Sequence, residues 1–320
     1  MSSRIAGVPD TLRNPAPGVG TLRGVSTNPH PRLRVAAIDF LNPAPLMWDF
    51  EHPPLAAPLA ARYQIDRMMP SQCADSLASG DADIGLVPIA ALATTPGLRI
   101  LPGCTIASKG RVRSLQLVRR ASQPLDALRT VAADTASRST LAYARILFPQ
   151  WGNARVLFVP MAADLDAMLD HADAAIVIGD PALLALEERA NRFERTGEEL
   201  ICHDLAEEWV KLTGLPFVSA VWGATARGSH WKENIAQDFI VSRDHGLQNI
   251  DTLVSEWTRR LPLSEQILRT YLTTNIHYFL DEQCIEAMRT FFRMAAQCGV
   301  LPGYSLPDGL EPSSRHERVL

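Results

Sequence analysis

Two stretches of the chain, DADIGLVPIAAL at residues 81–92 and DAAIVIGDPALL at residues 173–184, share one pattern that decides the fold. Each begins with an acidic residue, runs through a short apolar segment, and reaches a proline before a second apolar segment. Apolar runs of this length, bounded by turn residues, are typical of strands that are buried on both faces of a sheet. The repetition predicts two similar units, each with a buried strand near its end.

The segments that precede the two stretches also correspond. The first unit is predicted to contain strands at residues 33–38, 63–69 and 83–87 and a helix capped by Ser71 and ended by Gly80, while prolines leave the helical content of 45–62 open. The second unit is predicted to contain strands at residues 130–133, 154–159 and 174–178 and helices at residues 139–148 and 163–170. This alternation is typical of parallel sheets with helices on both faces.

The C-terminal part decides how the two units are arranged. It is predicted to hold a strand at residues 217–222 and then only helices, at residues 231–247, 252–260, 264–268 and 281–297. A helical tail without its own sheet would return to cover the first unit. We therefore predict an α/β fold with two lobes joined by two crossings, near 116–120 and 217–222, which is a hinge geometry. The predicted division is a disordered extension at 1–30, lobe 1 at 31–117 plus 222–320, and lobe 2 at 118–221.

Composition narrows the class of protein. The chain has 320 residues, of which 47% are hydrophobic and 21% charged, and its formal net charge is −4. These values are globular and offer no basic surface for nucleic acid. The first 30 residues lack the apolar run of a signal peptide, and no apolar run is long enough to span a membrane. With five widely spaced cysteines, we expect a cytoplasmic protein with reduced thiols. A homodimer is left open.

The segment DTASRST at residues 134–140 is the first candidate site. Ligands in open α/β sheets bind beyond the carboxyl ends of the strands, where this segment lies. It carries hydroxyls at Thr135, Ser137, Ser139 and Thr140, and a guanidinium at Arg138, where a helix is predicted to begin. Helix N-termini bind carboxylates and phosphates readily, but serine and threonine also favour such positions as simple caps. The residues leave both interpretations open.

Other segments at strand ends supply weaker candidates. Asn42 could bind a ligand, or it could serve the turn before Pro43. Ile89 follows the predicted strand at 83–87, and Gly179 and Asp180 follow that at 174–178; for Asp180 a helix cap is favoured over catalysis. Arg111 and Arg113 could meet an anion, although solvated arginines are the favoured interpretation.

Several kinds of site are not indicated by the sequence. It shows no dinucleotide-binding glycine pattern, no phosphate-binding loop and no serine-hydrolase elbow. The eight histidines lack the spacing of metal ligands, so we expect neither a metal nor a cofactor. Glu207 and Glu208 are adjacent and do not face each other on a helix, and Trp209 and Trp222 are expected in the core.

In order and spacing, these segments resemble the chorismate dehydratases of the futalosine route to menaquinone. The matching stretches are RVAAIDFLNPAPL (34–46), GDADIGLVPIAAL (80–92), LPGCTIASKGRVRSLQL (101–117), VAADTASRSTLAYARILF (131–148), ADAAIVIGDPALL (172–184) and DLAEEWVKLTGLPFVSAVW (204–222). With the Leu-Pro near 302 they cover nearly all of 32–302. The resemblance implies a two-lobed fold of the periplasmic-binding-protein type (type II).

The resemblance also implies a reaction and a set of site residues. Chorismate would lose water to give 3-[(1-carboxyvinyl)oxy]benzoate, a carbon–oxygen lyase reaction without a cofactor. Asn42 matches an asparagine of the family's pocket that is important for activity, and Ser114 matches a serine that follows Val-Arg. Thr135, Ser137 and Ser139 match the family's hydroxyl cluster. This chain departs from the family at Pro43-Ala44, where the family commonly has a hydroxyl residue after the asparagine, so it lacks that hydroxyl.

A mechanism can be stated as a hypothesis from this substrate. Chorismate is a dianion, so the 134–140 segment would bind one carboxylate, and Ser114, with Arg113 as a further candidate, would bind the other. Asn42 would orient the ring hydroxyl or the enolpyruvyl group. No histidine or glutamate base stands out in the matched motifs, which suggests that a carboxylate of the substrate takes the proton while the protein supplies orientation and electrostatics.

Three alternatives stay open. A solute-binding protein would have the same fold but normally needs export or a lipid anchor, whereas the first cysteine here is Cys73. Another enzyme on this scaffold, such as the later naphthoate synthase of the same pathway, would show motifs that are not found. A regulatory ligand-binding domain would carry a DNA-binding helix pair, which is not apparent.

Overall fold

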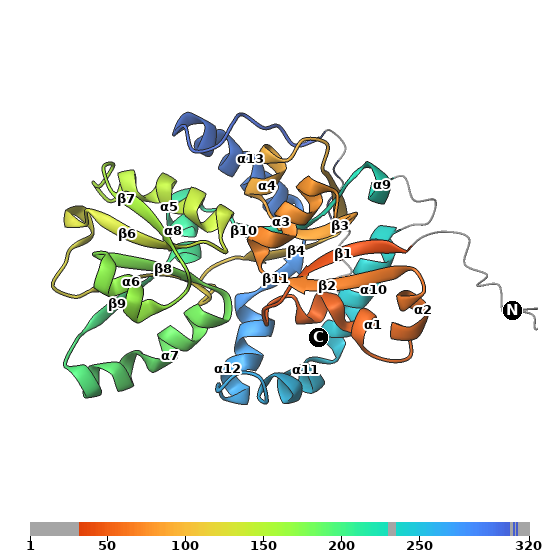
Figure 1. Cartoon of the computed structure of the whole chain (residues 1–320), viewed down its shortest axis with the longest axis horizontal. Helices are drawn as coiled ribbons and strands as arrows, with labels where there is room; N and C mark the ends of the chain where they lie inside the picture. The colour runs from red at the N-terminus through yellow and green to blue at the C-terminus, as the bar shows by residue number, and fades with distance from the viewer. Residues whose placement is uncertain (1–31, 230–234, 308–309, 311, 313–320) are drawn as a thin grey trace, which may run out of the picture. The chain divides into compact units, whose positions relative to one another are not determined.

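The computed structural model describes residues 32–229, 235–307, 310 and 312. The extension predicted to be disordered, residues 1–30, lies outside the described residues, as does the start of the helix predicted at 231–247. The described residues form two mixed β-sheets flanked by helices (Figure 1). The predicted α/β class is therefore confirmed.

The first sheet has six strands in the order β11-β4-β10-β3-β1-β2. Its strands are β1 (Leu33–Ile38), β2 (Tyr63–Met68), β3 (Ile84–Pro88), β4 (Arg99–Ser108), β10 (Phe217–Ala224) and β11 (His277–Phe279). β1 runs parallel to β2 and β3, whereas β10 is antiparallel to both β3 and β4. The antiparallel strands β10 and β11 enter from the C-terminal part, so the sheet is mixed.

The second sheet has five strands in the order β7-β6-β8-β5-β9. Its strands are β5 (Leu115–Arg120), β6 (Thr130–Asp134), β7 (Leu157–Met161), β8 (Ala174–Ile178) and β9 (Leu200–Asp204). β6 runs parallel to β7 and β8, and β5 is antiparallel to β8 and β9. The two sheets therefore share one plan, a parallel trio joined by an antiparallel strand.

The helices connect these strands. Before the second sheet they are η1 (Ala44–Met47), α1 (Trp48–Glu51), α2 (Ala56–Ala60), α3 (Pro70–Ser79) and α4 (Ala90–Thr94). The helices that follow strands of the second sheet are η2 (Leu125–Ala127), α5 (Arg138–Gln150), α6 (Leu165–His171), α7 (Gly179–Thr196) and α8 (Leu205–Thr213). The later ones are α9 (Ala226–Ser229), α10 (Ile235–Gln248), α11 (Ile250–Trp257), α12 (Glu265–Thr270), the π-helical turn η3 (Tyr271–Asn275) and α13 (Glu282–Gln297).

Some predicted boundaries are wrong for identifiable reasons. The helix predicted to be capped by Ser71 begins at Pro70 after Met69, because proline suits the first helical position; it ends at Gly80 as predicted, with φ 79°. The strand predicted at 154–159 begins at Leu157 because a turn precedes it. The tail is not purely helical, since its residues 277–279 form β11 and pair with β4.

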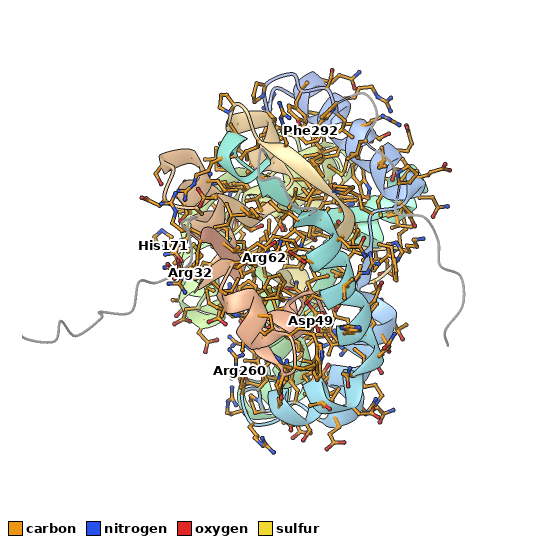
Figure 2. All side chains as sticks on the ribbon, turned by 90° about the vertical axis from the view of Figure 1, so that its right-hand side faces the viewer. Arg32, Asp49, Arg62, His171, Arg260 and Phe292 are labelled. Atoms are coloured by element: carbon orange, nitrogen blue, oxygen red, sulfur yellow. The ribbon has the colours of Figure 1, made fainter. Side chains whose placement is uncertain are left out.

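The tail packs largely against the first sheet, while α13 contacts both β10 and α5. α10 lies against η1, α1 and β4, and the labelled Asp49 of α1 lies beside α10 in Figure 2. The backbone N–H of Asp49 donates to Ser242 Oγ at 3.0 Å, and the Asp49 carboxylate pairs with His245 of α10. Trp209 and Trp222 are fully buried in the core, as expected.

The chain passes from the first sheet to the second between Ser108 and Leu115, and returns between Thr213 and Phe217. These two links follow the predicted crossings in order but not in exact place, because all of β10 pairs within the first sheet. We retain the division into two lobes as a proposal and move its second boundary from residue 221 to the link before Phe217.

Candidate active site

A cavity opens where strands of both sheets end. The empty space between its walls, open solvent included, is about 470 Å³. Its lining comes from Ile38, Phe40, Asn42, Pro70, Pro88, Ile106, Ser114, Leu115, Ser137, Ser139, Thr140, Ile178, Gly179, Ser219 and Ala220. Ile38, Pro88 and Ile178 are the last residues of the parallel strands β1, β3 and β8, so the site lies where the strand-end rule predicts.

Two serines at the start of α5 present hydroxyl groups to this cavity. Ser137 caps the helix, because its Oγ accepts the backbone N–H of Thr140 at 3.1 Å. Ser139 Oγ accepts the N–H of Ala90, the first residue of α4, at 3.0 Å. A hydroxyl that accepts from a backbone N–H keeps its own O–H as a donor. The capping interpretation of this segment is confirmed, and both serines keep an O–H that is free to donate to a ligand.

Ser114 lies at the end of the link between the sheets, and Asp204 fixes the turn before it. Asp204 accepts the backbone N–H of Val112 at 3.2 Å and that of Arg113 at 2.6 Å. Arg113 has a φ of 68°, the left-handed region that favours glycine. Burial raises the pKa of Asp204, against the effect of these N–H groups. Strained backbone beside a cavity is common at functional sites, and here it delivers Ser114 to the cavity wall.

Asn42 reaches the cavity from the loop after β1, which contacts the start of α7. A Cβ on Gly179 would lie 2.5 Å from the ring of Phe40, and Gly179 has a φ of 63°. The backbone N–H of Leu41 donates to Asp180 Oδ1 at 3.0 Å. Burial raises the pKa of Asp180 to about 6. Gly179 is therefore required both by conformation and by the close approach of Phe40.

Six of the predicted residues meet at the cavity, and the others do not line it. Those that line it are Asn42, Ser114, Ser137, Ser139, Thr140 and Gly179. Thr135 is exposed, and Arg138 is half-buried and pairs with Asp75 of α3. Ile89 is buried with its N–H bonded to Ser219 O, and Asp180 is bonded to Leu41. Arg111 and Arg113 pair with Glu207 and Glu187, so neither guanidinium is directed at the cavity.

Two residues near this site had not been singled out from the sequence. Ser219 lines the cavity because β10 has a bulge there: Val218 pairs with Ala107 and Ala220 with Ile106, which leaves Ser219 as the extra residue. Tyr271, the first residue of η3, is fully buried; burial raises the pKa of its hydroxyl, and the side chains of Ser114 and Asn42 act to lower it. A bulge depends on strand pairing, and a tyrosine in a helical pattern indicates core, so the sequence offered no signal for either.

The cavity lining is neutral. Among the described residues that line it, none carries a charged side chain, and five carry hydroxyls: Ser114, Ser137, Ser139, Thr140 and Ser219. The carboxyl of Asp134, at the end of β6, has its pKa raised by burial, and its Oδ2 has no partner in the described part of the chain. An anion in this cavity would be held by hydroxyls, an amide and helix N-termini.

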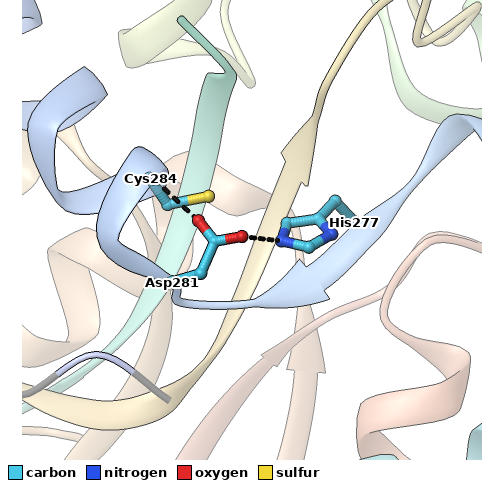
Figure 3. A group of neighbouring side chains, drawn as sticks. All are labelled: His277, Asp281 and Cys284. Carbon is cyan, nitrogen blue, oxygen red and sulfur yellow. Dashed lines mark hydrogen bonds and ion pairs between the residues drawn. The ribbon is translucent and has the colours of Figure 1, made fainter. Parts of the chain in front are cut away.

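His277, Asp281 and Cys284 form a cluster outside the cavity that has the residue types of a metal site (Figure 3). Asp281 Oδ2 already accepts from Lys109 Nζ at 2.8 Å and pairs with His277 Nε2 at 3.0 Å, while its Oδ1 caps α13 through the N–H of Cys284. Burial raises the pKa of the Cys284 thiol, which disfavours the thiolate that a metal needs. The ammonium group of Lys109 already occupies the position beside Asp281 that a metal cation would take. We therefore assign the cluster a role in stabilising the fold.

No helix in the described part of the chain is long and apolar enough to cross a membrane.

Comparisons with known proteins agree with the fold and with the resemblance. A family model described as menaquinone biosynthesis matches residues 33–297. The chain is 28% identical over 228 residues to a Thermus thermophilus protein named chorismate dehydratase, and the match covers 69% of this chain and 82% of that protein.

Solved structures show the same fold. One is a Candida albicans protein described as having the generic periplasmic binding protein fold, with a TM-score of 0.62, 14% identity, and coverage of 86% of this chain and 92% of that one. Another is the alkanesulfonate-binding protein of Xanthomonas axonopodis pv. citri, with a TM-score of 0.62, 16% identity, and coverage of 85% and 94%. The predicted fold of the periplasmic-binding-protein type is confirmed.

Proposed function

Because the chain belongs to the menaquinone-biosynthesis family, whose model matches residues 33–297, we propose that it is a chorismate dehydratase. The reaction breaks the C3–H and C4–O bonds of chorismate, forms an aromatic ring, and releases the hydrogen and hydroxyl as water. The product is 3-[(1-carboxyvinyl)oxy]benzoate, which makes the enzyme a hydro-lyase. The single observation that carries the proposal is the meeting of Asn42, Ser114, Ser137 and Ser139 in one neutral cavity.

The donors of the cavity suit a dianion with two separate carboxylates. Ser137 and Ser139, with the start of α5, are proposed to bind one carboxylate through O–H donors and the helix N-terminus. Ser114 is proposed to bind the other carboxylate from the link between the sheets. Arg113 is left out of this role, because its guanidinium pairs with Glu187. Asn42 would then face the reacting ring.

The neutral lining also limits which group can act as the catalytic base. No histidine, aspartate, glutamate or lysine is among the described residues that line the cavity. We infer that a carboxylate of the substrate takes the C3 proton, while the protein holds the reacting groups in place and stabilises the departing hydroxyl. Aromatisation of the ring supplies the driving force, so orientation and a few placed donors would suffice.

The deciding experiment is to incubate the purified protein with chorismate and follow the product by mass spectrometry. We expect conversion, and we expect Asn42→Ala to lower kcat/KM by about 100-fold, the usual effect of losing one donor at a developing charge, with its melting temperature unchanged. An Asn42→Ala protein with full turnover would remove Asn42 from the mechanism.

One alternative function is that of a solute-binding protein, because such proteins share this fold. The same experiment tests it. If chorismate is not converted and calorimetry instead detects tight binding of an unrelated small carboxylate or sulfonate, the protein is a binding protein and the proposed activity is wrong.

A further inference from the structure

Ser219 is the one residue of β10 that is not buried, although β10 lies inside the first sheet between β3 and β4. Ser219 also lines the cavity, so its exposed surface is available to a ligand there. Asn42 is the other polar lining residue that keeps exposed surface. The remaining hydroxyl residues of the lining are buried, namely Ser114, Ser137, Ser139 and Thr140.

The backbone of the β10 bulge is fixed on every side. Each of its three carbonyl groups accepts a hydrogen bond: Val218 O from the Tyr143 hydroxyl at 3.2 Å, Ser219 O from the N–H of Ile89 at 3.1 Å, and Ala220 O from Thr105 Oγ1 at 2.8 Å. Bulges next to active sites commonly re-aim a side chain. Because its backbone is held by α5, the start of α4 and β4, Ser219 presents its side chain from a defined place in the wall.

The hydroxyl of Ser219 makes no hydrogen bond with the described part of the chain, and only its carbonyl group is bonded. Ser137 and Ser139 differ in this respect, since the oxygen of each already accepts a backbone N–H. The hydroxyl of Ser219 therefore keeps both its O–H donor and its acceptor lone pairs for a ligand.

Two consecutive N–H groups place Ser219 on the same side of the cavity as Ser139. The N–H of Ile89 donates to Ser219 O at 3.1 Å, and that of Ala90 donates to Ser139 Oγ at 3.0 Å. Ser219 therefore lies beside the start of α5, where Ser137 and Ser139 are proposed to bind a carboxylate. A carboxylate has two oxygens and about four acceptor positions, so it has room for a third O–H donor.

We propose that Ser219 is a further substrate-binding residue: its hydroxyl is the third O–H donor to the carboxylate held by Ser137 and Ser139. This inference rests on the proposed dehydratase activity and deepens it, because it names the group of the substrate that Ser219 meets. Hydrogen bonds to a carboxylate lower its affinity for a proton. The carboxylate with three hydroxyl donors is therefore held, and the C3 proton goes to the other carboxylate, beside Ser114.

Steady-state kinetics of Ser219→Ala test this role. KM for chorismate should rise by about tenfold, the effect of one hydrogen bond to a charged group, while kcat changes by less than about twofold, because a carboxylate that is only held is bound equally in the ground and transition states. Alanine is small and Ser219 is half-buried, so the melting temperature should match that of wild type. A wild-type KM, or a fall in kcat without a rise in KM, would overturn the proposal.

Ser76→Ala is the matched control. Ser76 of α3 is also half-buried, but its hydroxyl donates to Met68 Sδ at 3.4 Å and it does not line the cavity. We expect wild-type KM and kcat for Ser76→Ala. A tenfold rise in KM there as well would mean that removing any half-buried hydroxyl disturbs the site, and the specific role of Ser219 would be rejected.

Double variants test which carboxylate Ser219 meets. In a Ser114→Ala background, Ser219→Ala should again raise KM by about tenfold, because the two residues hold different carboxylates. In a Ser139→Ala background the same change should raise KM by less than about threefold, because a carboxylate that has lost one donor can shift away from the next. Equal rises in the two backgrounds would overturn the assignment of Ser219 to the carboxylate at α5.

A binding measurement separates this inference from the proposed function. Calorimetry with chorismate in the Asn42→Ala background, where turnover is slow, should give a Kd that rises about tenfold when Ser219→Ala is added. If Kd rises and the wild-type protein converts no chorismate, the role of Ser219 in binding stands and only the dehydratase proposal fails. If chorismate is converted and Kd does not rise, the Ser219 proposal fails and the dehydratase proposal stands. If the protein neither binds nor converts chorismate, both are wrong.

Discussion

The backbone N–H of Leu41 donates to Oδ1 of Asp180 at 3.0 Å, which joins the loop after β1 of the first sheet to the first turn of α7 in the second. Asn42 follows Leu41 directly, so this bond also places the amide that we assign to the reaction. Burial raises the pKa of Asp180 to about 6, although the Leu41 bond and Arg260 act in the opposite direction. A carboxylate that titrates in this range makes the junction between the sheets sensitive to pH.

We predict that Asp180 makes the folded protein less stable as pH rises. Its pKa is raised from 3.8 in the unfolded chain to about 6 in the folded protein, so between these values the folded state binds more protons. The contribution of Asp180 is therefore fully present below about pH 3.8 and lost as pH rises through about 6. Asp180→Asn keeps an acceptor for Leu41 but cannot titrate. Urea unfolding at several pH values should show the variant gaining stability relative to wild type from pH 4 to 7.

A constant difference between Asp180→Asn and wild type across that range would contradict the raised pKa. Only the difference between the two proteins is informative, because other carboxyls titrate in both.

Gly179→Ala should damage both stability and activity. A left-handed φ costs an alanine about 1–2 kcal/mol, and the new methyl group would also meet the ring of Phe40, which lines the cavity. Gly197, at the end of α7, has a similar φ of 71°, but a Cβ added there would have no atom within 4 Å. Gly197→Ala should therefore lose only the backbone cost and keep wild-type turnover. Thermal unfolding and product formation should be measured for both variants. Equal turnover of Gly179→Ala and Gly197→Ala would show that the contact with Phe40 does not matter for activity.

Much of the fold could be predicted because its strands are short apolar runs that end in turn residues. β1 and β8 were predicted with their bounds. β4 was missed, because Pro102 and Gly103 interrupt its pattern, and only its pairing with β10 and β11 makes it a strand. β11 was missed because three residues within a helical tail carry too little pattern, so its existence depends on a partner far away in sequence.

The site could be predicted to the level of segments but not of atoms. In DTASRST, Ser137 and Ser139 line the cavity while Thr135 does not. That choice depends on the turn after β6, in which Asp134 accepts the backbone N–H of Ala136 through Oδ1 and that of Ser137 through its carbonyl. A sequence gives the hydroxyls without stating which of them a turn directs inward.

Ser139→Ala should therefore weaken substrate binding much more than Thr135→Ala. Ser139 lines the cavity, and its Oγ also accepts the N–H of Ala90, whereas Thr135 is exposed. A hydrogen bond to a charged group contributes about 1.5–3 kcal/mol, so kcat/KM for chorismate should fall by about tenfold to 100-fold in Ser139→Ala. Thr135→Ala is the matched control from the same motif and should behave as wild type. Equal losses in the two variants would show that the whole segment, and not the inward hydroxyl, is what matters.

We predict that Asp281 affects the pH dependence of folding stability in the opposite direction to Asp180. Variants at this position also distinguish the effect of its helix cap from the effect of its charge. Burial alone would raise the pKa of Asp281, but Lys109, the Cys284 N–H and His277 outweigh it and lower the pKa to about 2. The contribution of Asp281 is therefore present above about pH 3.8 and lost as pH falls through about 2. Asp281→Asn keeps a good cap for α13 and loses the charge; Asp281→Ala loses the cap as well, at a further cost of about 1 kcal/mol. Unfolding at pH 7 should rank wild type, Asp281→Asn and Asp281→Ala in decreasing stability, and the gap between the first two should narrow as the pH falls below 4. A gap that stays constant down to pH 2 would mean that Lys109 does not stabilise the ionised carboxylate.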